Sequence, residues 1–196
     1  MLREKLQHKR IILASGSPRR QQFFRELDID FTIQIKEVEE IYPNDLQASE
    51  ITIFLAELKA NAFDLLEENE ILITSDTIVW HENKALGKPK DAQDAFEMLQ
   101  SLSGKTHEVI TSICFKTKNT LETITETTKV TFNSLSDEAI RYYIDTYQPF
   151  DKAGSYGIQE WIGLVGITKI EGSYTNVVGL PVEKVYKKLI HYAENY

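Results

Sequence analysis

The chain has 196 residues, of which 42% are hydrophobic, and its 22 basic and 30 acidic side chains give a formal net charge of −8. A chain of this length buries enough apolar surface to fold as one domain, or as one core extended into two lobes, without a disulfide or a structural metal. The acidic balance argues against nucleic acid and membrane partners, but it leaves room for an anionic small molecule bound by clustered cations. We expect one domain over residues 1–196, with residues 1–9 as an N-terminal extension.

The cysteine content and the N-terminal segment indicate the cellular compartment. The single cysteine, Cys114, has no partner for an internal disulfide and lies in an apolar stretch, so we expect a core residue. The N-terminal segment is charged throughout and resembles no signal peptide, and no apolar run is long enough to span a membrane. These features predict a cytoplasmic protein.

The first half of the chain alternates between strand and helix patterns. The predicted elements are strands at 10–15, 31–36 and 71–80 and helices at 18–28 and 48–68. Ser17 suits the cap of the first helix and Pro18 its first position, and Ser49 suits the cap of the second.

The second half adds a hairpin and three helices. The predicted elements are helices at 91–102, 136–146 and 182–193 and strands at 106–117, 121–133 and 167–170. Four of the nine glycines lie between 154 and 166, which predicts a shaped loop in which the backbone closely approaches another group. Strands and helices in this order indicate an α/β fold with a mixed sheet.

Two positions break the local rules. Arg19 and Arg20 place two cations in the first turn of a helix, where the dipole favours carboxylates, so this turn suits a phosphate chain as well as it suits two solvated arginines. Asp76 lies inside an apolar strand, where a carboxylate is expected only if it is paired or binds a metal.

Other polar residues carry less information when taken singly. Lys59 fits a surface lysine on the border of an apolar helix face, and Lys88 fits an ordinary turn lysine. Glu39 and Glu40 suit a solvated loop, although either supplies a second carboxylate for Mg²⁺ beside Asp76. The four histidines have no metal-ligand spacing.

Six short motifs resemble, in the same order, those of the Maf family of nucleoside triphosphate pyrophosphatases. They are Ser15-Gly16-Ser17-Pro18-Arg19-Arg20, Ser75-Asp76-Thr77, Gly87-Lys88-Pro89, Leu102-Ser103-Gly104, the stretch from Asp151 to Gln159, and Gly179-Leu180-Pro181. The resemblance extends from about Arg10 to the last helix. It implies an elongated mixed sheet flanked by helices, with two lobes around a cleft, similar to the inosine triphosphate pyrophosphatases.

The resemblance also implies an activity and a set of site residues. Family members hydrolyse a nucleoside triphosphate to the monophosphate and pyrophosphate with a divalent cation, for which Mg²⁺ is expected and Mn²⁺ or Co²⁺ is an alternative. By position, Asp76 matches the family's proton acceptor and Glu40 an acidic residue of the site, so both are expected at the metal. The phosphate-binding set matches Ser15, Arg19, Arg20, Lys59 and Lys88, and the positions that distinguish the dTTP/UTP branch match Arg19, Thr77 and Gln159.

The chain departs from the family pattern at two places. Ser75 stands where alanine is frequent, and Glu160-Trp161 follows Gln159 where small residues are common. Trp161 suits either stacking on a base or packing of the loop.

The resemblance predicts hydrolysis of dTTP and UTP, with a house-cleaning role against non-standard nucleotides. A pyrophosphatase for a modified purine nucleotide is the first alternative. The second is a nucleotide-binding regulator of septum formation that acts through protein contacts. The resemblance is also compatible with a homodimer.

Overall fold

The computed structural model describes residues 1–195, which divide into two compact units. The first unit comprises Met1–Asp76, Thr111–Glu126 and the chain from Gly179 onward, and the second comprises Thr77–Ile110 and Thr127–Val178. Two units agree with the two lobes expected from the sequence. Among residues 1–195, no helix is both long and apolar enough to cross a membrane.

The strands form one mixed sheet, as the sequence predicts. They are β1 (Arg10–Leu13), β2 (Phe31–Ile33), β3 (Glu70–His81), β4 (Lys84–Leu86), β5 (Thr106–Lys116), β6 (Leu121–Phe132) and β7 (Ile167–Glu171). Their order is β2-β1-β3-β5-β6-β7, with β4 paired to β3. β1 is parallel to both β2 and β3, whereas β4 and β7 are antiparallel to their neighbours. The short connection from β5 to β6 makes that pair a hairpin.

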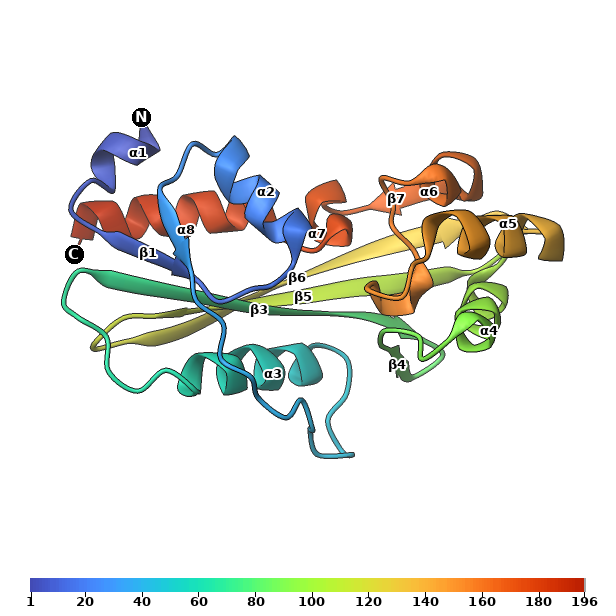
Figure 1. The fold of residues 1–196 in the computed structure, drawn as a ribbon, viewed down its shortest axis with the longest axis horizontal. Coiled ribbons are helices and arrows are strands. Elements are labelled where there is room, and N and C mark those ends of the chain that lie inside the picture. The colour runs from blue at the N-terminus through green and yellow to red at the C-terminus, as the bar shows by residue number, and fades with distance from the viewer. Residues whose placement is uncertain (196) are drawn as a thin grey trace. The chain divides into compact units, whose positions relative to one another are not determined.

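In the first unit, helices cover both faces of the sheet (Figure 1). Helices α1 (Leu2–Lys5), α2 (Pro18–Glu26) and α8 (Val182–Asn195) lie on one face, and α3 (Ser49–Asn61) lies on the other. Side chains alternate along β3, so Ile71 and Ile73 pack in the core with α2 and α8, while Leu72 packs with α3. The same alternation places Asp76 on the α3 face. Cys114 is buried in the α3 core, as predicted.

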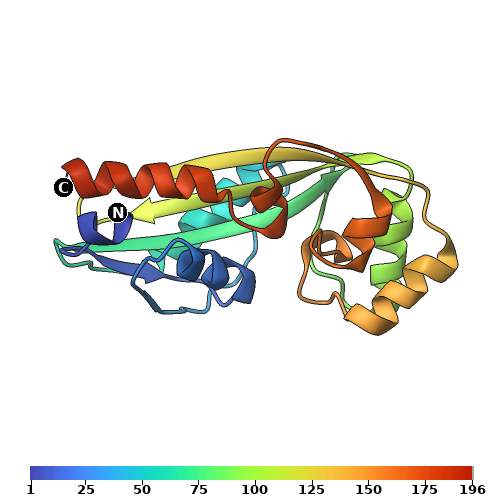
Figure 2. The same cartoon turned by 90° about the horizontal axis from the view of Figure 1, so that it is seen from above.

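The second unit has its own core. Helix α4 (Ala92–Leu102) packs against α5 (Asp137–Tyr147), and Figure 2 shows α4 in green beside α5 in orange. The 3₁₀ turn η1 (Ala153–Ser155) packs against α4. Ser136 caps α5, because its hydroxyl accepts a hydrogen bond from Ala139 N at 3.2 Å.

The predicted helix over 48–68 is wrong at both ends. The observed helix, α3, ends at Asn61. A longer helix would need the carbonyls of residues 60 to 63 as hydrogen-bond acceptors, but lysine ammonium groups bind three of them. Lys116 Nζ binds the oxygens of Ala60 and Phe63, and Lys36 Nζ binds that of Ala62. Leu65 therefore lies beyond the end of the helix and is 95% exposed.

Its predicted cap is also wrong. The N-cap is Ala48, whose φ of 48° lies in the left-handed region, and Ser49 is the first helical residue. Gln47 N instead donates to Glu50 Oε2 at 2.9 Å, so a carboxylate satisfies a backbone donor at this end.

Three further differences concern short elements. Helices α6 (Trp161–Gly166) and α7 (Tyr174–Val178) form where loops were predicted. The strand predicted over 31–36 is only three residues long and lies at the sheet edge, and Ile35, beyond its end, is 60% exposed. The close approach predicted for the glycine-rich loop is confirmed at Gly163, where a Cβ would lie 1.8 Å from Ile158 O.

Candidate active site

Asp76 is the most buried carboxylate among the predicted site residues. Its side chain is 10% exposed, and Oδ1 lies 2.7 Å from Lys59 Nζ. Lys59 also lies 3.0 Å from Glu40 Oε1, and its own side chain is 18% exposed. The reading of Lys59 as a surface lysine is therefore wrong. Helix α3, strand β3 and the loop before α3 bring one ammonium and two carboxylates together within the first unit.

Arg20 is anchored beside Asp76 by backbone oxygens. Its Nε donates to Gly179 O at 2.9 Å and its Nη1 donates to Ser75 O at 3.0 Å. Burial lowers the pKa of Arg20, while the charges of Asp76 and Glu40 oppose this change and that of Arg19 adds to it. A guanidinium keeps its charge under such conditions, so α2 presents a fixed cation next to the carboxylates.

The turn before α2 has the predicted form but a different hydrogen-bond pattern. Ser17 is the N-cap and Pro18 follows it, yet within the described residues no backbone N–H donates to the Ser17 side chain. Ser15 is 6% exposed, and its Oγ accepts a hydrogen bond from Ser17 N at 3.3 Å. Arg19 is half-buried in the first turn of the helix. Because the helix has no capping side chain, its N-terminus suits an anion.

The other predicted residues belong to the second unit. Thr77 follows Asp76 in β3 and is half-buried, whereas Lys88 and Gln159 are exposed on loops. The two loops are joined, because Gly154 N donates to Gly87 O at 3.0 Å. A Cβ on Gly154 would lie 2.7 Å from Val79 Cγ2, so the backbone passes directly over β3 here.

The residues that are expected at a metal fit a magnesium ion only in part. Among residues 1–195, no group of three or more His, Cys, Asp or Glu side chains is placed to hold an ion. Glu40 and Asp76 nevertheless converge on one point, the Lys59 ammonium. Two hard carboxylates agree with the chemistry of Mg²⁺, which takes its other ligands from water and substrate phosphates.

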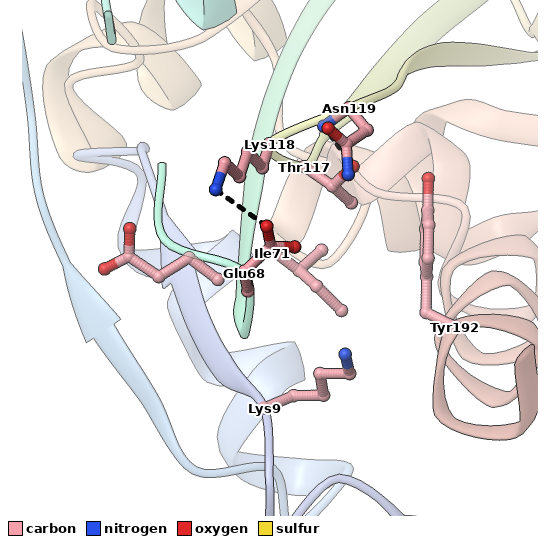
Figure 3. A pocket seen from close by; sticks show the side chains of 8 residues that line it. Lys9, Glu68, Ile71, Thr117, Lys118, Asn119 and Tyr192 are labelled. Carbon is pink, nitrogen blue, oxygen red and sulfur yellow. Dashed lines mark hydrogen bonds and ion pairs between the residues drawn. The ribbon is translucent and has the colours of Figure 1, made fainter. Parts of the chain in front are cut away.

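The first unit also contains a pocket of about 80 Å³, which none of the predicted site residues lines (Figure 3). Tyr192 and the ion pair of Lys118 with Glu68 line it, together with Ile71 near the start of β3. Ile71 precedes Asp76 by five residues, or about 16 Å along an extended strand. The pocket is therefore separate from the candidate site.

Sequence reasoning missed the residues that hold the site in place. The oxygens of Ser75 and Gly179 are backbone groups, and no side-chain pattern predicts that they bind Arg20. Tyr143 and Lys152 hold the loop that carries Gln159 through their contacts with Glu160, and no sequence pattern pointed to Tyr143. Trp161 packs edge-on against Tyr142, with ring centroids 4.9 Å apart, which favours loop packing over stacking on a base.

Comparison with known proteins extends over nearly the whole chain. The sequence profile of the family described as Maf-like protein matches residues 10–192. A dTTP/UTP pyrophosphatase of Flavobacterium psychrophilum is 67% identical over 98% of this chain and 99% of its own, and one of Bacteroides fragilis is 51% identical over 94% and 96%.

The fold also matches a solved structure. The Staphylococcus aureus Ham1 protein superposes with a TM-score of 0.50 at 15% identity, covering 92% of this chain and 100% of its own. This likeness concerns the fold alone and agrees with the α/β architecture expected from the sequence. On the family profile and the identity to its relatives, the chain belongs to the Maf-like protein family.

Proposed function

We propose that this protein is a nucleoside triphosphate pyrophosphatase that hydrolyses dTTP and UTP to the monophosphate and pyrophosphate. The observation that carries the proposal is Lys59, held between Glu40 and Asp76 beside the anchored guanidinium of Arg20. The choice of substrate is supported by relatives at 45% to 67% identity whose names are dTTP/UTP pyrophosphatase.

The cations of the first unit suit the triphosphate. The uncapped N-terminus of α2 offers backbone N–H groups and a positive dipole, and Arg19 and Arg20 add charge in the same turn. Lys59 exchanges its carboxylate partners for phosphate oxygens when the substrate binds. These contacts strengthen as negative charge moves onto the leaving pyrophosphate, so they lower the barrier of the chemical step.

Asp76 suits the role of proton acceptor. Water attacks the α-phosphorus and forms a new P–O bond, while the bond from that phosphorus to the oxygen bridging the β-phosphate breaks. The electron pair of the broken bond leaves with pyrophosphate, and the proton of the attacking water passes to Asp76 Oδ. In the absence of substrate, Asp76 Oδ1 forms an ion pair with Lys59 Nζ, and a carboxylate oxygen in this position suits the acceptance of this proton.

Glu40 and Asp76 would hold the divalent cation, of which Mg²⁺ suits their hard oxygens best and Mn²⁺ or Co²⁺ is an alternative. When bound, the cation neutralises charge on the phosphates. Thr77, Lys88 and Gln159 belong to the second unit, and their part in substrate binding remains a prediction from the family resemblance.

Several finer points remain predictions. We expect a cytoplasmic protein with no nucleic acid partner and with room for a homodimer. We also expect a house-cleaning role, in which non-standard nucleotides are hydrolysed along with dTTP and UTP.

The proposal is tested with a panel of nucleotides. The wild-type protein is incubated with Mg²⁺ and each of dTTP, UTP, dCTP, dATP, dGTP and modified pyrimidine triphosphates, and released pyrophosphate is measured. Fastest release from dTTP and UTP supports the proposal. Preference for a purine, or binding without release, contradicts it.

A further inference from the structure

A buried polar cluster in the second unit is not used by the chemistry above. Lys152 is 8% exposed and Tyr143 is fully buried, and both contact the side chain of Glu160. Lys152 Nζ lies 3.1 Å from Glu160 Oε1 and 2.7 Å from Asp151 Oδ1. Tyr143 donates a short hydrogen bond to Glu160 Oε2. Both carboxylate oxygens of Glu160 are therefore held.

Tyr143 also binds the backbone of the same loop. Its hydroxyl oxygen accepts a hydrogen bond from Gly157 N at 3.0 Å. Burial raises the pKa of Tyr143 and the Glu160 carboxylate raises it further, so the hydroxyl keeps its proton and continues to donate. One side chain of α5 thus fixes the loop at two points, residues 157 and 160.

Gln159 lies between these two points. A Cβ on Gly157 would lie 2.8 Å from Glu160 Cδ and 3.0 Å from Gln159 Nε2, so the side chains of Gln159 and Glu160 both turn back over Gly157. Gln159 itself is exposed, in contrast to the buried residues before it. The cluster therefore fixes the backbone on both sides of an exposed amide.

We propose that Tyr143 and Glu160 are positioning residues that hold Gln159 in the orientation in which its amide binds the nucleotide base. This inference rests on the proposed function. A purely structural role does not explain the use of polar groups, because a buried ion pair stabilises a fold little more than well-packed apolar residues do. The directional hydrogen bonds of this polar cluster, however, suit an amide that must be held at a fixed angle.

The test compares three variants with a matched control. Tyr143→Phe removes the shared hydroxyl, Glu160→Gln keeps the side-chain size but removes the charge, and Gln159→Ala removes the amide. The control is Tyr147→Phe, which removes a hydroxyl from the same helix. Within residues 1–195 the Tyr147 hydroxyl makes no hydrogen bond, although its ring stacks on Tyr143 at 5.2 Å.

Affinity is measured by calorimetry with α,β-imido-dTTP, which has nitrogen in place of the scissile bridging oxygen, and with the corresponding dGTP analogue. Each of the three variants should weaken binding of the dTTP analogue about tenfold, because the loss of one hydrogen bond to the base has an effect of about this size. Affinity for the dTTP analogue should then lie closer to affinity for the dGTP analogue. Tyr143→Phe combined with Glu160→Gln should weaken binding no more than either alone, because both act on one loop. Tyr147→Phe should bind as the wild type does.

Two outcomes overturn the inference. The first is a lowered thermal midpoint in Tyr143→Phe and Glu160→Gln with unchanged affinity and unchanged preference, which is what a structural cluster alone produces. The second is wild-type affinity in Gln159→Ala. Failure of the proposed function looks different, because then the wild type binds the analogue but releases no pyrophosphate from dTTP.

Discussion

Lys59 Nζ lies 2.7 Å from Asp76 Oδ1, and the same ammonium lies 3.0 Å from Glu40 Oε1. This pair joins helix α3 to strand β3 and explains how a carboxylate is tolerated inside an apolar strand. The ion pair also holds the side chains of Asp76 and Lys59 in a fixed orientation in the absence of nucleotide.

Arg20 should be important for stability as well as binding. Replacement of Arg20 with alanine removes two charge-assisted hydrogen bonds and leaves the oxygens of Ser75 and Gly179 without their donor. We expect the free energy of unfolding to fall by about 3 kcal/mol. Urea denaturation measures this change. Arg25→Ala, at the exposed end of the same helix, is the control and should change stability by under about 0.5 kcal/mol.

Arg19 should affect kinetics without a comparable loss of stability. If its guanidinium binds the phosphates more tightly in the transition state than in the bound substrate, Arg19→Ala raises KM and lowers kcat, with kcat/KM for dTTP falling at least about tenfold. Steady-state pyrophosphate release gives both constants. Kinetics equal to those of Arg25→Ala would mean that Arg19 is merely a solvated arginine.

His107 should make the protein less stable in mild acid. Burial lowers the pKa of His107 to about 3, with a smaller contribution from the charge of His81. Between this value and the unfolded value of about 6.5 the unfolded chain binds the extra proton, so stability falls as pH is lowered through this window, by up to about 1.4 kcal/mol per pH unit.

The variant His107→Gln keeps a hydrogen-bonding group for Tyr156, whose hydroxyl lies 2.7 Å from His107 Nε2, but it does not titrate. Urea unfolding at pH 6.5, 5.5 and 4.5 should give a flatter pH dependence for this variant than for the wild type. If the stability of the two proteins changed with pH in the same way, His107 would not be the source of the pH dependence.

Cys114 should be unreactive in the folded protein. The thiol is buried, and burial raises its pKa to about 11, so the reactive thiolate is scarce at neutral pH. An aromatic disulfide reagent at pH 8 should label the native protein far more slowly than the protein in guanidinium chloride. Equal labelling rates would show that this part of the core opens readily.

Much of the fold was predictable because its signals are local. The apolar runs of β1 and β3, the cap at Ser136 and the final helix all follow from residue type and spacing. The end of α3 was not predictable in this way. It depends on ammonium groups from Lys36 and Lys116, which lie far away in sequence, and these compete with the helix for its last carbonyls.

The residues of the candidate site likewise differ in whether a local sequence signal indicates them. Arg19, Arg20 and Asp76 break local rules, so the sequence alone drew attention to them. Lys59 breaks none, so only the family resemblance drew attention to it, and its contact with Asp76 became visible in the fold. Tyr143 gave no signal, because its two contacts are a backbone amide and a carboxylate on another segment.

The most direct test of the account is pyrophosphate release from dTTP by Asp76→Asn. The substitution preserves the size of the side chain and leaves Lys59 paired with Glu40. Asp64→Asn, at an exposed position of the same unit, is the matched control. We predict that Asp76→Asn keeps the circular dichroism of the wild type and loses turnover by about 10³-fold or more, while Asp64→Asn retains it. An Asp76→Asn protein that releases pyrophosphate at the wild-type rate would contradict the account.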